Sequence, residues 1–357
     1  MRMSRLLLPM KSWALSIDSM KRVAVVILNY NGASMLEKFL PTVVAFSPEA
    51  DVIVADNASN DNSVDLLVDK FPSVPIIRLV RNYGFADGYN KALAQVEAEY
   101  YMLLNSDVEV AEGWLSPLLS FMEANSNVVA CQPKLLDYKN KAFFEYAGAA
   151  GGFIDRYGYP YCRGRIFDTV EKDCGQYNDA YPVFWATGAA LMVRSKDYWA
   201  AGGLDGRFFA HMEEVDLCWR LKSRGGEIYC VPQSEVYHVG GATLDKSNPR
   251  KTFLNFRNNL LMLYKNLPDN ELCHVMAVRA ILDYVAAFKF LLSGNTGDFK
   301  AVLSARKEYK RMRGSYAGAR KENIKETVVQ KPSGRGSFML LWQYYMCRRK
   351  YFNQLKR

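Results

Sequence analysis

The sequence predicts an α/β fold: a doubly wound, mostly parallel sheet flanked by helices, with a basic helical extension at the C-terminal end. Three observations lead to this prediction. Short apolar runs rich in β-branched residues alternate with helical patterns through the first half, and each run ends in a polar loop. After about residue 250 the pattern becomes helical and basic. With 357 residues, 50% of them hydrophobic, the chain can bury a sizeable core.

The expected elements follow one another in β-α-β order. Residues 22–28 form a continuous apolar run, as expected of a strand that is buried on both faces. Residues 35–46 have helical spacing, with a break expected near Pro41. The further expected elements are a strand at 51–56, a helix at 64–71, a strand at 75–80, a helix at 88–100 and a strand at 100–105. Such short connections imply a parallel sheet, which binds ligands at the carboxyl ends of its strands.

Polar loops follow the four expected strands. They are residues 29–32, 56–63, 81–90 and 105–110. Because parallel strands end at one edge of a sheet, we expect these loops to outline a single site, although loops are commonly polar without any function. The chain contains neither GxGxxG nor GxxxxGK[ST], so neither a dinucleotide-binding fingerprint nor a P-loop is predicted.

Two carboxylates, Asp107 and Glu109, lie just past the fourth expected strand. In an extended segment residues i and i+2 point the same way, and two carboxylates on one side suit a hard divalent cation such as Mg²⁺ or Mn²⁺. Acidic pairs are also common in loops without any metal. His238, one of only three histidines, would join this site if the fold brings it close.

A second acidic group lies in the stretch "HMEEVDLCWR" at residues 211–220. A helix over about 214–224 would place Glu213, Glu214 and Asp216 near its first turn, with its basic residues toward the end. This arrangement complements the helix dipole and requires no function. The dipole accounts less well for three carboxylates beside a preceding aromatic, glycine-rich loop.

The net charge of +9 is concentrated at the C-terminal end. Residues 300–357 contain sixteen Lys or Arg against three Glu, so the tail carries +13 and the remainder −4. Such a tail suits an anionic membrane surface or a nucleic acid, although solvated helices would show the same excess. No RNA- or DNA-binding motif occurs, so no nucleic-acid partner is expected. Seven cysteines without a CxxC pair indicate a reducing compartment and no structural zinc.

No stretch reaches the ~20 apolar residues that a membrane-spanning helix requires. Residues 277–292 contain Arg279, Asp283 and Lys289, and residues 338–346 are too few, although they could lie at a membrane interface. The expected organisation is a leader at 1–20 with Met20 as a possible true start, a catalytic domain at 21–250, and a helical, basic C-terminal region at 251–357. Residues 321–337 are expected to form an exposed linker.

Taken in order, these motifs resemble family 2 glycosyltransferases of the GT-A fold, particularly the rhamnosyltransferase-like branch. The resemblance runs from about residue 22 to residue 265. It is carried by "VVILNYNG", "DNASNDNS", "NYGFADGYN", "LLNSDVEV", "TGAALMVRS", "GGLDGRFFAHMEEVDLCWR" and "HVGGAT".

The resemblance implies a site for a nucleotide-sugar. Tyr30 matches the residue that packs on the base, and Asp56 matches the carboxylate that accepts the base N–H. Asp107 and Glu109 match the metal motif, and His238 matches a position that often completes it. The other residues assigned to the nucleotide-sugar site in this way are Asn29, Asn31, Asn57, Ser59, Asn82, Gly84, Gly88, Asn90, Thr187, Gly188 and Arg257.

The catalytic base of the family is the second acid of a Glu-Asp-x-Asp motif. The stretch "EEVD" places Glu214 at that position, so this chain has Glu where the family has Asp. Glu can perform the same deprotonation because its pKa is similar. The neighbouring Glu213 and Asp216 remain alternative candidates.

The resemblance implies an inverting enzyme that uses Mn²⁺ or Mg²⁺. It would transfer a sugar from dTDP-rhamnose or a UDP-sugar to a hydroxyl of a glycan or lipid-linked acceptor in bacterial-type cell-surface polysaccharide assembly. The expected location is cytoplasmic, peripheral on the inner membrane, with the tail on the anionic surface. The oligomeric state is not predicted.

Two alternatives remain open at this point. A sugar-nucleotide pyrophosphorylase has a similar architecture, but it normally shows a glycine-rich loop with Arg or Lys directly after the first strand. A non-enzymatic membrane- or nucleic-acid-binding protein would leave the carboxylates unexplained.

Overall fold

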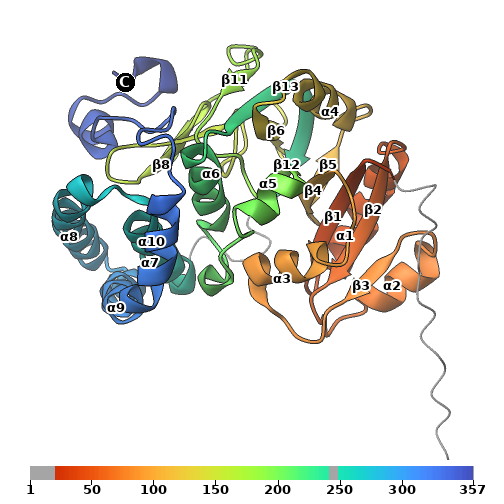
Figure 1. Cartoon of the computed structure of the whole chain (residues 1–357), viewed down its shortest axis with the longest axis horizontal. Coiled ribbons are helices and arrows are strands. Elements are labelled where there is room, and N and C mark those ends of the chain that lie inside the picture. The colour runs from red at the N-terminus through yellow and green to blue at the C-terminus, as the bar shows by residue number, and fades with distance from the viewer. Residues whose placement is uncertain (1–20, 241–247, 357) are drawn as a thin grey trace, which may run out of the picture.

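A computed structural model describes residues 21–240 and 248–356, so the predicted leader and Met20 lie outside the described residues. A nine-stranded sheet forms the centre, in the order β11-β13-β6-β12-β4-β1-β2-β3, with β5 paired to β13 (Figure 1). Its strands are β1 Val23–Asn29, β2 Ala50–Asp56, β3 Ile76–Arg78, β4 Tyr100–Asn105, β5 Val108–Val110, β6 Val128–Asp137, β11 Tyr181–Pro182, β12 Ala190–Arg194 and β13 Glu227–His238.

The N-terminal half of the sheet is parallel, as the sequence predicts. β1 pairs in parallel with β2 and β4, and β2 pairs in parallel with β3. The four strands therefore end at the same edge, at Asn29, Asp56, Arg78 and Asn105. β12 runs antiparallel to β4 and β6, which makes the whole sheet mixed. The predicted α/β class with a mostly parallel sheet is confirmed.

Helices cover both faces of the sheet, which explains why β1 is buried along almost its whole length. They are α1 Ala33–Ala45, α2 Ser63–Lys70, α3 Gly84–Leu93, α4 Leu115–Ala124, α5 Ser195–Ala200 and α6 Glu213–Ser223. Two predictions were wrong here. α1 continues past Pro41, whose ring lies on the exposed side, and α3 ends at Leu93, several residues before the expected end.

A small second sheet lies beside the central one and was not predicted. It has the order β10-β9-β8-β7, from β7 Gly152–Ile154, β8 Pro160–Cys162, β9 Arg165–Ile166 and β10 Thr169–Val170. Trp185 joins the two sheets, because its indole N–H donates to the carbonyl of Phe153 at 3.0 Å.

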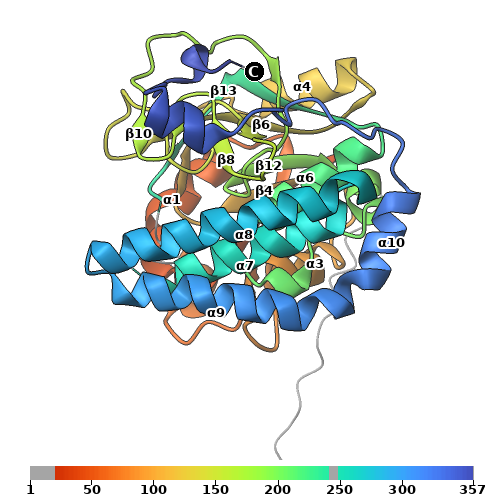
Figure 2. The same ribbon diagram turned by 90° about the vertical axis from the view of Figure 1, so that its left-hand side faces the viewer.

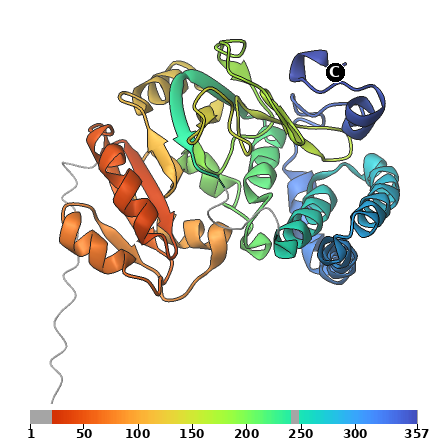
Figure 3. The same ribbon diagram turned by 180° about the vertical axis from the view of Figure 1, so that it is seen from behind.

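The C-terminal region forms a helical layer at the end of the molecule opposite the N-terminal strands (Figures 1 and 3). Its helices are α7 Pro249–Asn266, α8 Asp269–Leu292, α9 Thr296–Met312 and α10 Ala317–Lys325. Figure 2 shows α7, α8 and α9 side by side on one face, with the last residues above them. Among the described residues, none of these helices combines the length and apolarity that crossing a membrane requires.

The predicted linker at 321–337 is instead part of the packed structure. α10 extends to Lys325, and the segment after it lies against the body of the protein. The amide of Val328 donates to the carbonyl of Ser223 at 2.8 Å, and that of Gly336 donates to the carbonyl of Ile154 at 2.7 Å. These long-range contacts cannot be read from a polar composition, which is why the linker prediction was wrong.

Candidate active site

A cavity of about 410 Å³ opens where the strand ends, the start of α6 and the C-terminal helices meet. Six of the residues predicted from the sequence line it, namely Asp107, Thr187, Gly188, Glu213, Glu214 and His238. Aromatic side chains supply much of the remaining wall, including Phe85, Tyr146, Tyr159, Phe167 and Trp185. Carboxylates from two distant parts of the chain therefore face one largely apolar cavity.

The loops after β1 and β2 are joined by hydrogen bonds. The Asn29 amide nitrogen lies 3.2 Å from both an Asp56 carboxylate oxygen and the Ser59 hydroxyl. The amide of Asn31 donates to the Ser59 hydroxyl at 2.9 Å, and the Ser59 amide donates to Asp56 at 3.0 Å. Tyr30 projects from this cluster with 45% of its surface exposed. The predicted base-binding residues are thus brought together, with an aromatic ring left free for stacking.

The loop before α3 is tied to the same cluster by Asn57. The Asn57 amide nitrogen donates to the carbonyl of Gly84 at 2.9 Å and to Asn82 at 3.2 Å. Gly84 has φ +76°, and a Cβ there would lie 2.5 Å from the ring of Phe209. A Cβ on Gly88 would lie 3.0 Å from Leu28. Only glycine fits at position 84, because both the backbone angle and the space exclude a side chain.

Of the three predicted metal residues, Asp107 and His238 are in contact with each other, whereas Glu109 is not part of this contact. Asp107 Oδ1 lies 3.2 Å from His238 Nε2, and the Asn105 amide nitrogen lies 3.5 Å from the same ring nitrogen. Glu109 forms an ion pair with Lys141 and does not line the cavity. Within the described residues, no group of three or more His, Cys, Asp or Glu side chains has the geometry of a metal site.

The structure does not bring Glu109 to the cavity beside Asp107, because Asp107 is not in an extended segment. Ser106 and Asp107 form the turn between β4 and β5, so the alternation rule that holds within a strand does not relate Asp107 to Glu109. The turn brings Asn105, at the end of β4, to the side of the cavity where Asp107 lies. In "LLNSDVEV", Asn105 lies two residues before Asp107, just as Glu109 lies two residues after it. A comparison of these two spacings would have identified Asn105 as a candidate metal ligand.

Asn105, Asp107 and His238 fit a divalent cation such as Mn²⁺ or Mg²⁺ by their chemistry, because they present oxygen and imidazole nitrogen donors. Glu145 Oε1 lies 3.3 Å from His238 Nδ1, in the position of a carboxylate that orients a metal-binding histidine. Burial favours the neutral ring, but the charge of Glu145 and contact with Asp107 raise the pKa of His238 to about 10. The site therefore attracts positive charge strongly.

Glu213 and Glu214 begin α6, and both line the cavity. Each has one carboxylate oxygen, Oε2, that is buried and has no hydrogen-bond partner among the described residues. Burial raises the pKa of both groups, and the charge of Glu214 raises that of Glu213 further. Two adjacent buried carboxylates oppose each other's ionisation, so the pair favours a single negative charge, with one proton retained by Glu213 or Glu214.

We predict that Glu213→Gln makes the protein more stable at alkaline pH. The raised pKa of Glu213 means that the folded state holds a proton that the unfolded state has released. Wild-type stability from this group is therefore complete below the ordinary pKa of 4.5 and declines as pH rises toward the folded pKa. Gln removes that decline, so its stability advantage over wild type should be larger at pH 8 than at pH 5. Urea unfolding at pH 5 and pH 8 measures it, and an advantage equal at both pH values would contradict the prediction.

The loop before α6 is strained. Phe209 has φ 68° and ψ −61°, and the amide of Ala210 donates to the carbonyl of Phe208 at 2.9 Å, which is the geometry of a γ-turn. His211 and Met212 also have positive φ. Such strain is characteristic of functional loops, and here it places α6 with its two glutamates against the cavity.

His211 lines the cavity and was not assigned any role by the sequence. Burial and the nearby charge of Lys251 lower the pKa of His211 to about 4, so the ring is neutral at neutral pH. Its Nε2 is buried and has no hydrogen-bond partner among the described residues. The sequence offered one signal, the rarity of histidine in this chain, but nothing local to distinguish His211 from a buried structural residue.

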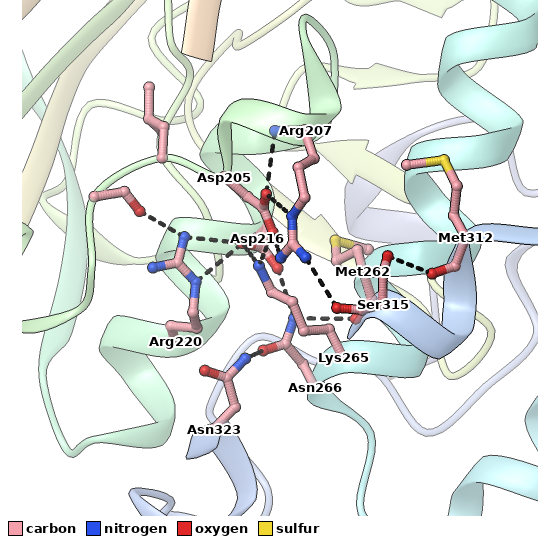
Figure 4. A network of polar contacts seen from close by, with 12 residues as sticks. Asp205, Arg207, Asp216, Arg220, Met262, Lys265, Asn266, Met312, Ser315 and Asn323 are labelled. Atoms are coloured by element: carbon pink, nitrogen blue, oxygen red, sulfur yellow. Dashed lines mark hydrogen bonds and ion pairs between the residues drawn. The ribbon is translucent and has the colours of Figure 1, made fainter. Parts of the chain in front are cut away.

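Asp216 lies one turn into α6 and belongs to a buried ionic network (Figure 4). Its carboxylate lies 2.7 Å from Lys265 Nζ, 2.8 Å from the Asn266 amide nitrogen and 2.8 Å from Arg220 Nη2. Lys265 also pairs with Asp205 at 2.8 Å. Asp216 is fully buried and does not line the cavity. The structure therefore places it away from a substrate, where it joins α6 to α7.

Two residues of the predicted nucleotide-sugar set have their side chains occupied elsewhere. Asn90 receives the hydroxyl of Tyr198 at 2.7 Å and donates to the carbonyl of Leu204 at 2.7 Å. Arg257 donates to the carbonyl of Phe208 at 3.0 Å. Neither lines the cavity. Both hold the loop of residues 198–208 in place, so they stabilise the site without lining the cavity.

The C-terminal helices complete the cavity, and the contribution of α8 was not predicted from the sequence. Arg279 of α8 lines it, with its guanidinium 4.6 Å from the centre of the Tyr159 ring. Arg279 is held by Asp283 at 3.1 Å, which in turn pairs with Arg306 of α9 at 2.6 Å. The catalytic and C-terminal regions predicted from the sequence thus share one site.

Comparison with known proteins shows which family this chain is similar to. Residues 24–178 match the family model described as "Glycosyl transferase family 2". An N-acetylglucosaminyl-diphospho-decaprenol L-rhamnosyltransferase of Mycobacterium tuberculosis is 26% identical over 229 residues, covering 60% of this chain and 75% of that protein. Rhamnosyltransferase WbbL of Escherichia coli is 22% identical over 223 residues, covering 60% of this chain and 83% of that protein.

Solved structures show the same fold. A crystal structure of GalNAc-T7 with UDP, GalNAc and Mn²⁺ superposes with a TM-score of 0.56 at 16% identity, covering 84% of this chain but only 57% of that one. The mannosyltransferase PcManGT of Pyrobaculum calidifontis, in complex with GDP-Man and Mn²⁺, gives a TM-score of 0.51 at 12% identity, covering 88% and 89% of the two chains. The family model and the curated relatives agree: the chain is similar to glycosyltransferase family 2, and the solved structures share its fold.

Proposed function

We propose that this protein transfers a sugar, with inversion, from a nucleotide-sugar to a hydroxyl of a glycan or lipid-linked acceptor in cell-surface polysaccharide assembly. One observation carries the proposal. A single cavity is lined on one side by Asn105, Asp107 and His238, and on another by Glu213 and Glu214 at the start of α6. The first set suits a diphosphate–metal unit, and the second suits a base for the incoming hydroxyl.

The donor would bind along the ends of β1 to β4. Tyr30 would pack on the base, and Asp56 would accept its N–H, while the loop of Asn82 and Gly84 would lie beside the ribose and phosphates. The rhamnosyltransferases among the relatives favour dTDP-rhamnose, and a UDP-sugar is the alternative. Specificity for either would rest on a few pocket contacts.

Asn105, Asp107 and His238 would hold a divalent cation. When bound, such an ion neutralises negative charge that develops on the leaving nucleoside diphosphate. Glu145 would keep the His238 ring in its binding orientation through the 3.3 Å contact to Nδ1. The buried Asp107 carboxylate, 4% exposed, keeps its charge directed into the cavity rather than into solvent.

Glu214 would act on the acceptor. Its ionised carboxylate takes the proton from the acceptor hydroxyl as that oxygen bonds to the anomeric carbon and the bond to the diphosphate breaks. The neighbouring Glu213, protonated, adds no competing negative charge. Thr187 and Gly188 line the same cavity and would lie beside the sugar. A Cβ on Gly188 would lie 3.2 Å from the Phe85 ring, so a larger residue there would press against Phe85.

The test is donor hydrolysis by the full chain, screened over UDP-, GDP- and dTDP-sugars with Mn²⁺ or Mg²⁺ and with EDTA. We expect one donor class to be hydrolysed only when the metal is present. Asp107→Ala should reduce this activity by at least about a hundredfold, because it removes the central charged ligand. Asn105→Ala should raise the Mn²⁺ concentration needed for half activity by about tenfold.

Glu109→Ala is the matched control, since it removes a carboxylate two residues away that pairs with Lys141 outside the cavity. Its activity should stay within about twofold of wild type, as for most surface changes. Hydrolysis that persists in EDTA, or equal losses in Asp107→Ala and Glu109→Ala, would refute the assigned metal site.

A further inference from the structure

The outward face of α8 exposes a continuous apolar stripe. Its side chains recur at helical spacing and are between 50% and 74% exposed, and they are Ile281, Tyr284, Val285, Phe288 and Leu292. The opposite face, with Val275, Arg279, Asp283 and Ala287, packs into the protein. Figures 1 and 2 show α8 at the outer edge of the helical layer. A stripe of this size is costly to leave in water and indicates an interaction surface.

A second exposed apolar group adjoins the end of this stripe. Trp342, Tyr345 and Met346 belong to the short helix Trp342–Met346 and are 44% to 62% exposed. Lys289 of α8 joins the two groups, because its Nζ lies 5.2 Å from the centre of the Tyr345 ring. The stripe and this helix therefore form one surface, which we call the α8 surface.

The charged residues of the α8 surface are all basic. Lys289 is exposed on α8, and Arg348, Arg349 and Lys350 follow the Trp342–Met346 helix. The acid of α8 nearest the stripe, Asp283, is fully buried, and residues 338–357 contain no Asp or Glu. Lys350 Nζ lies 3.6 Å from the centre of the Tyr344 ring, so its ammonium group is held on an aromatic face by a cation–π contact.

We propose that the α8 surface docks on an anionic lipid bilayer. Aliphatic and aromatic side chains would enter the interface, and the basic residues would meet lipid phosphates. A second copy of this chain fits less well. A two-fold dimer would bring the same basic residues of both copies toward one another with no acid to neutralise them. An interfacial helix needs no spanning length, which agrees with the absence of a spanning helix among the described residues.

The α8 surface lies next to the mouth of the cavity. Tyr345 stacks on Phe167 with ring centres 5.9 Å apart, and Phe167 itself lines the cavity. Docking would therefore bring the cavity to the bilayer surface, where a sugar acceptor carried on a lipid would reach Glu214 without leaving the membrane. Access of a lipid-linked acceptor to Glu214 rests on the proposed function, whereas membrane docking rests only on the exposed apolar and basic residues of the α8 surface.

The test is flotation of the full-length chain with vesicles of phosphatidylcholine alone or mixed with phosphatidylglycerol. We expect binding to the anionic vesicles that weakens at high salt. V285E/F288E should lose binding by at least about tenfold, because two charges replace the centre of the stripe. K289Q/R348Q should weaken binding by about twentyfold, from roughly fivefold for each charge, and should reduce the salt dependence.

Val68→Glu is the matched control, since Val68 is an equally exposed valine, 51%, on α2 at the far end of the molecule. It should bind vesicles as wild type does. Wild-type binding by V285E/F288E, or no binding by the wild-type chain, overturns the proposal. Light scattering completes the test. A wild-type dimer that V285E/F288E converts to a monomer, without vesicle binding, would assign this face to a second copy.

Donor hydrolysis separates this proposal from the proposed function. V285E/F288E changes nothing in the cavity, so its hydrolysis without vesicles should equal that of wild type. Vesicle binding without hydrolysis of any donor would refute the function and leave the α8 surface intact. Hydrolysis of a donor without vesicle binding would refute docking by the α8 surface and leave the proposed function intact.

Discussion

Glu214→Gln is expected to reduce sugar transfer by about 10²- to 10⁴-fold, the range that a general base contributes. Gln keeps the shape of the side chain but cannot accept a proton, so donor binding should remain nearly unchanged. Glu214 is suited to this role because its carboxylate lines the cavity with one oxygen that has no partner among the described residues. Single-turnover transfer measures the chemical step, and isothermal titration with the donor measures binding.

Glu213→Gln is the control for that result. Gln resembles a protonated glutamate, the form that the proposal gives Glu213 beside an ionised Glu214, so transfer should fall by less than about tenfold. If Glu213→Gln abolishes transfer and Glu214→Gln does not, then Glu213 is the general base and Glu214 is not. Full activity in Glu214→Gln would exclude it as the base.

The pH profile of transfer gives an independent check on the same pair. Burial raises the pKa of Glu214, and the base must be ionised to act, so activity should fall as pH drops through a value above the ordinary 4.5. Glu213→Gln should leave this acidic limb in place, since the proposal has Glu213 uncharged when Glu214 ionises. A limb that moves in this variant would show that Glu213 carries the charge.

Asp216→Ala is expected to destabilise the protein by about 3–5 kcal/mol, because it leaves buried positive charges without their partner. Lys265 and Arg220 are each about 5% exposed or less, and both lie within 2.8 Å of the Asp216 carboxylate (Figure 4). Lys265 would retain Asp205 alone. Urea unfolding at neutral pH gives the free energy of unfolding, and the transfer assay is run on the folded fraction.

The control is Asp87→Ala, which removes an exposed carboxylate that lies 3.9 Å from Lys91 on α3. Its effect on stability should stay within about 0.5 kcal/mol, as for other exposed ion pairs. An Asp216→Asn variant that unfolds like wild type but has lost transfer would identify Asp216 as catalytic instead of structural.

The parallel half of the fold could be predicted because its signals are local. The continuous apolar run of β1 reports burial on both faces, and the polar residues at Asn29, Asp56 and Asn105 mark strand ends that a parallel sheet must place at one edge. The second sheet and the packing of residues 326–337 depend on contacts between distant segments. The sequence pattern within either segment does not predict these contacts.

Within the site, the sequence by itself determined which loops converge and that Glu213 and Glu214 begin a helix beside them. Only the tertiary structure decided where each acid lies. Asp216 is withdrawn by Lys265 and Asn266, which lie 49 and 50 residues further along the chain. Glu109 is turned away because the chain reverses at Ser106 and Asp107 before β5 begins. The spacing of residues in the sequence predicts which way their side chains point only where the backbone keeps one conformation. The partners of a buried charge depend on packing between segments that are distant in the sequence, so sequence spacing does not predict them.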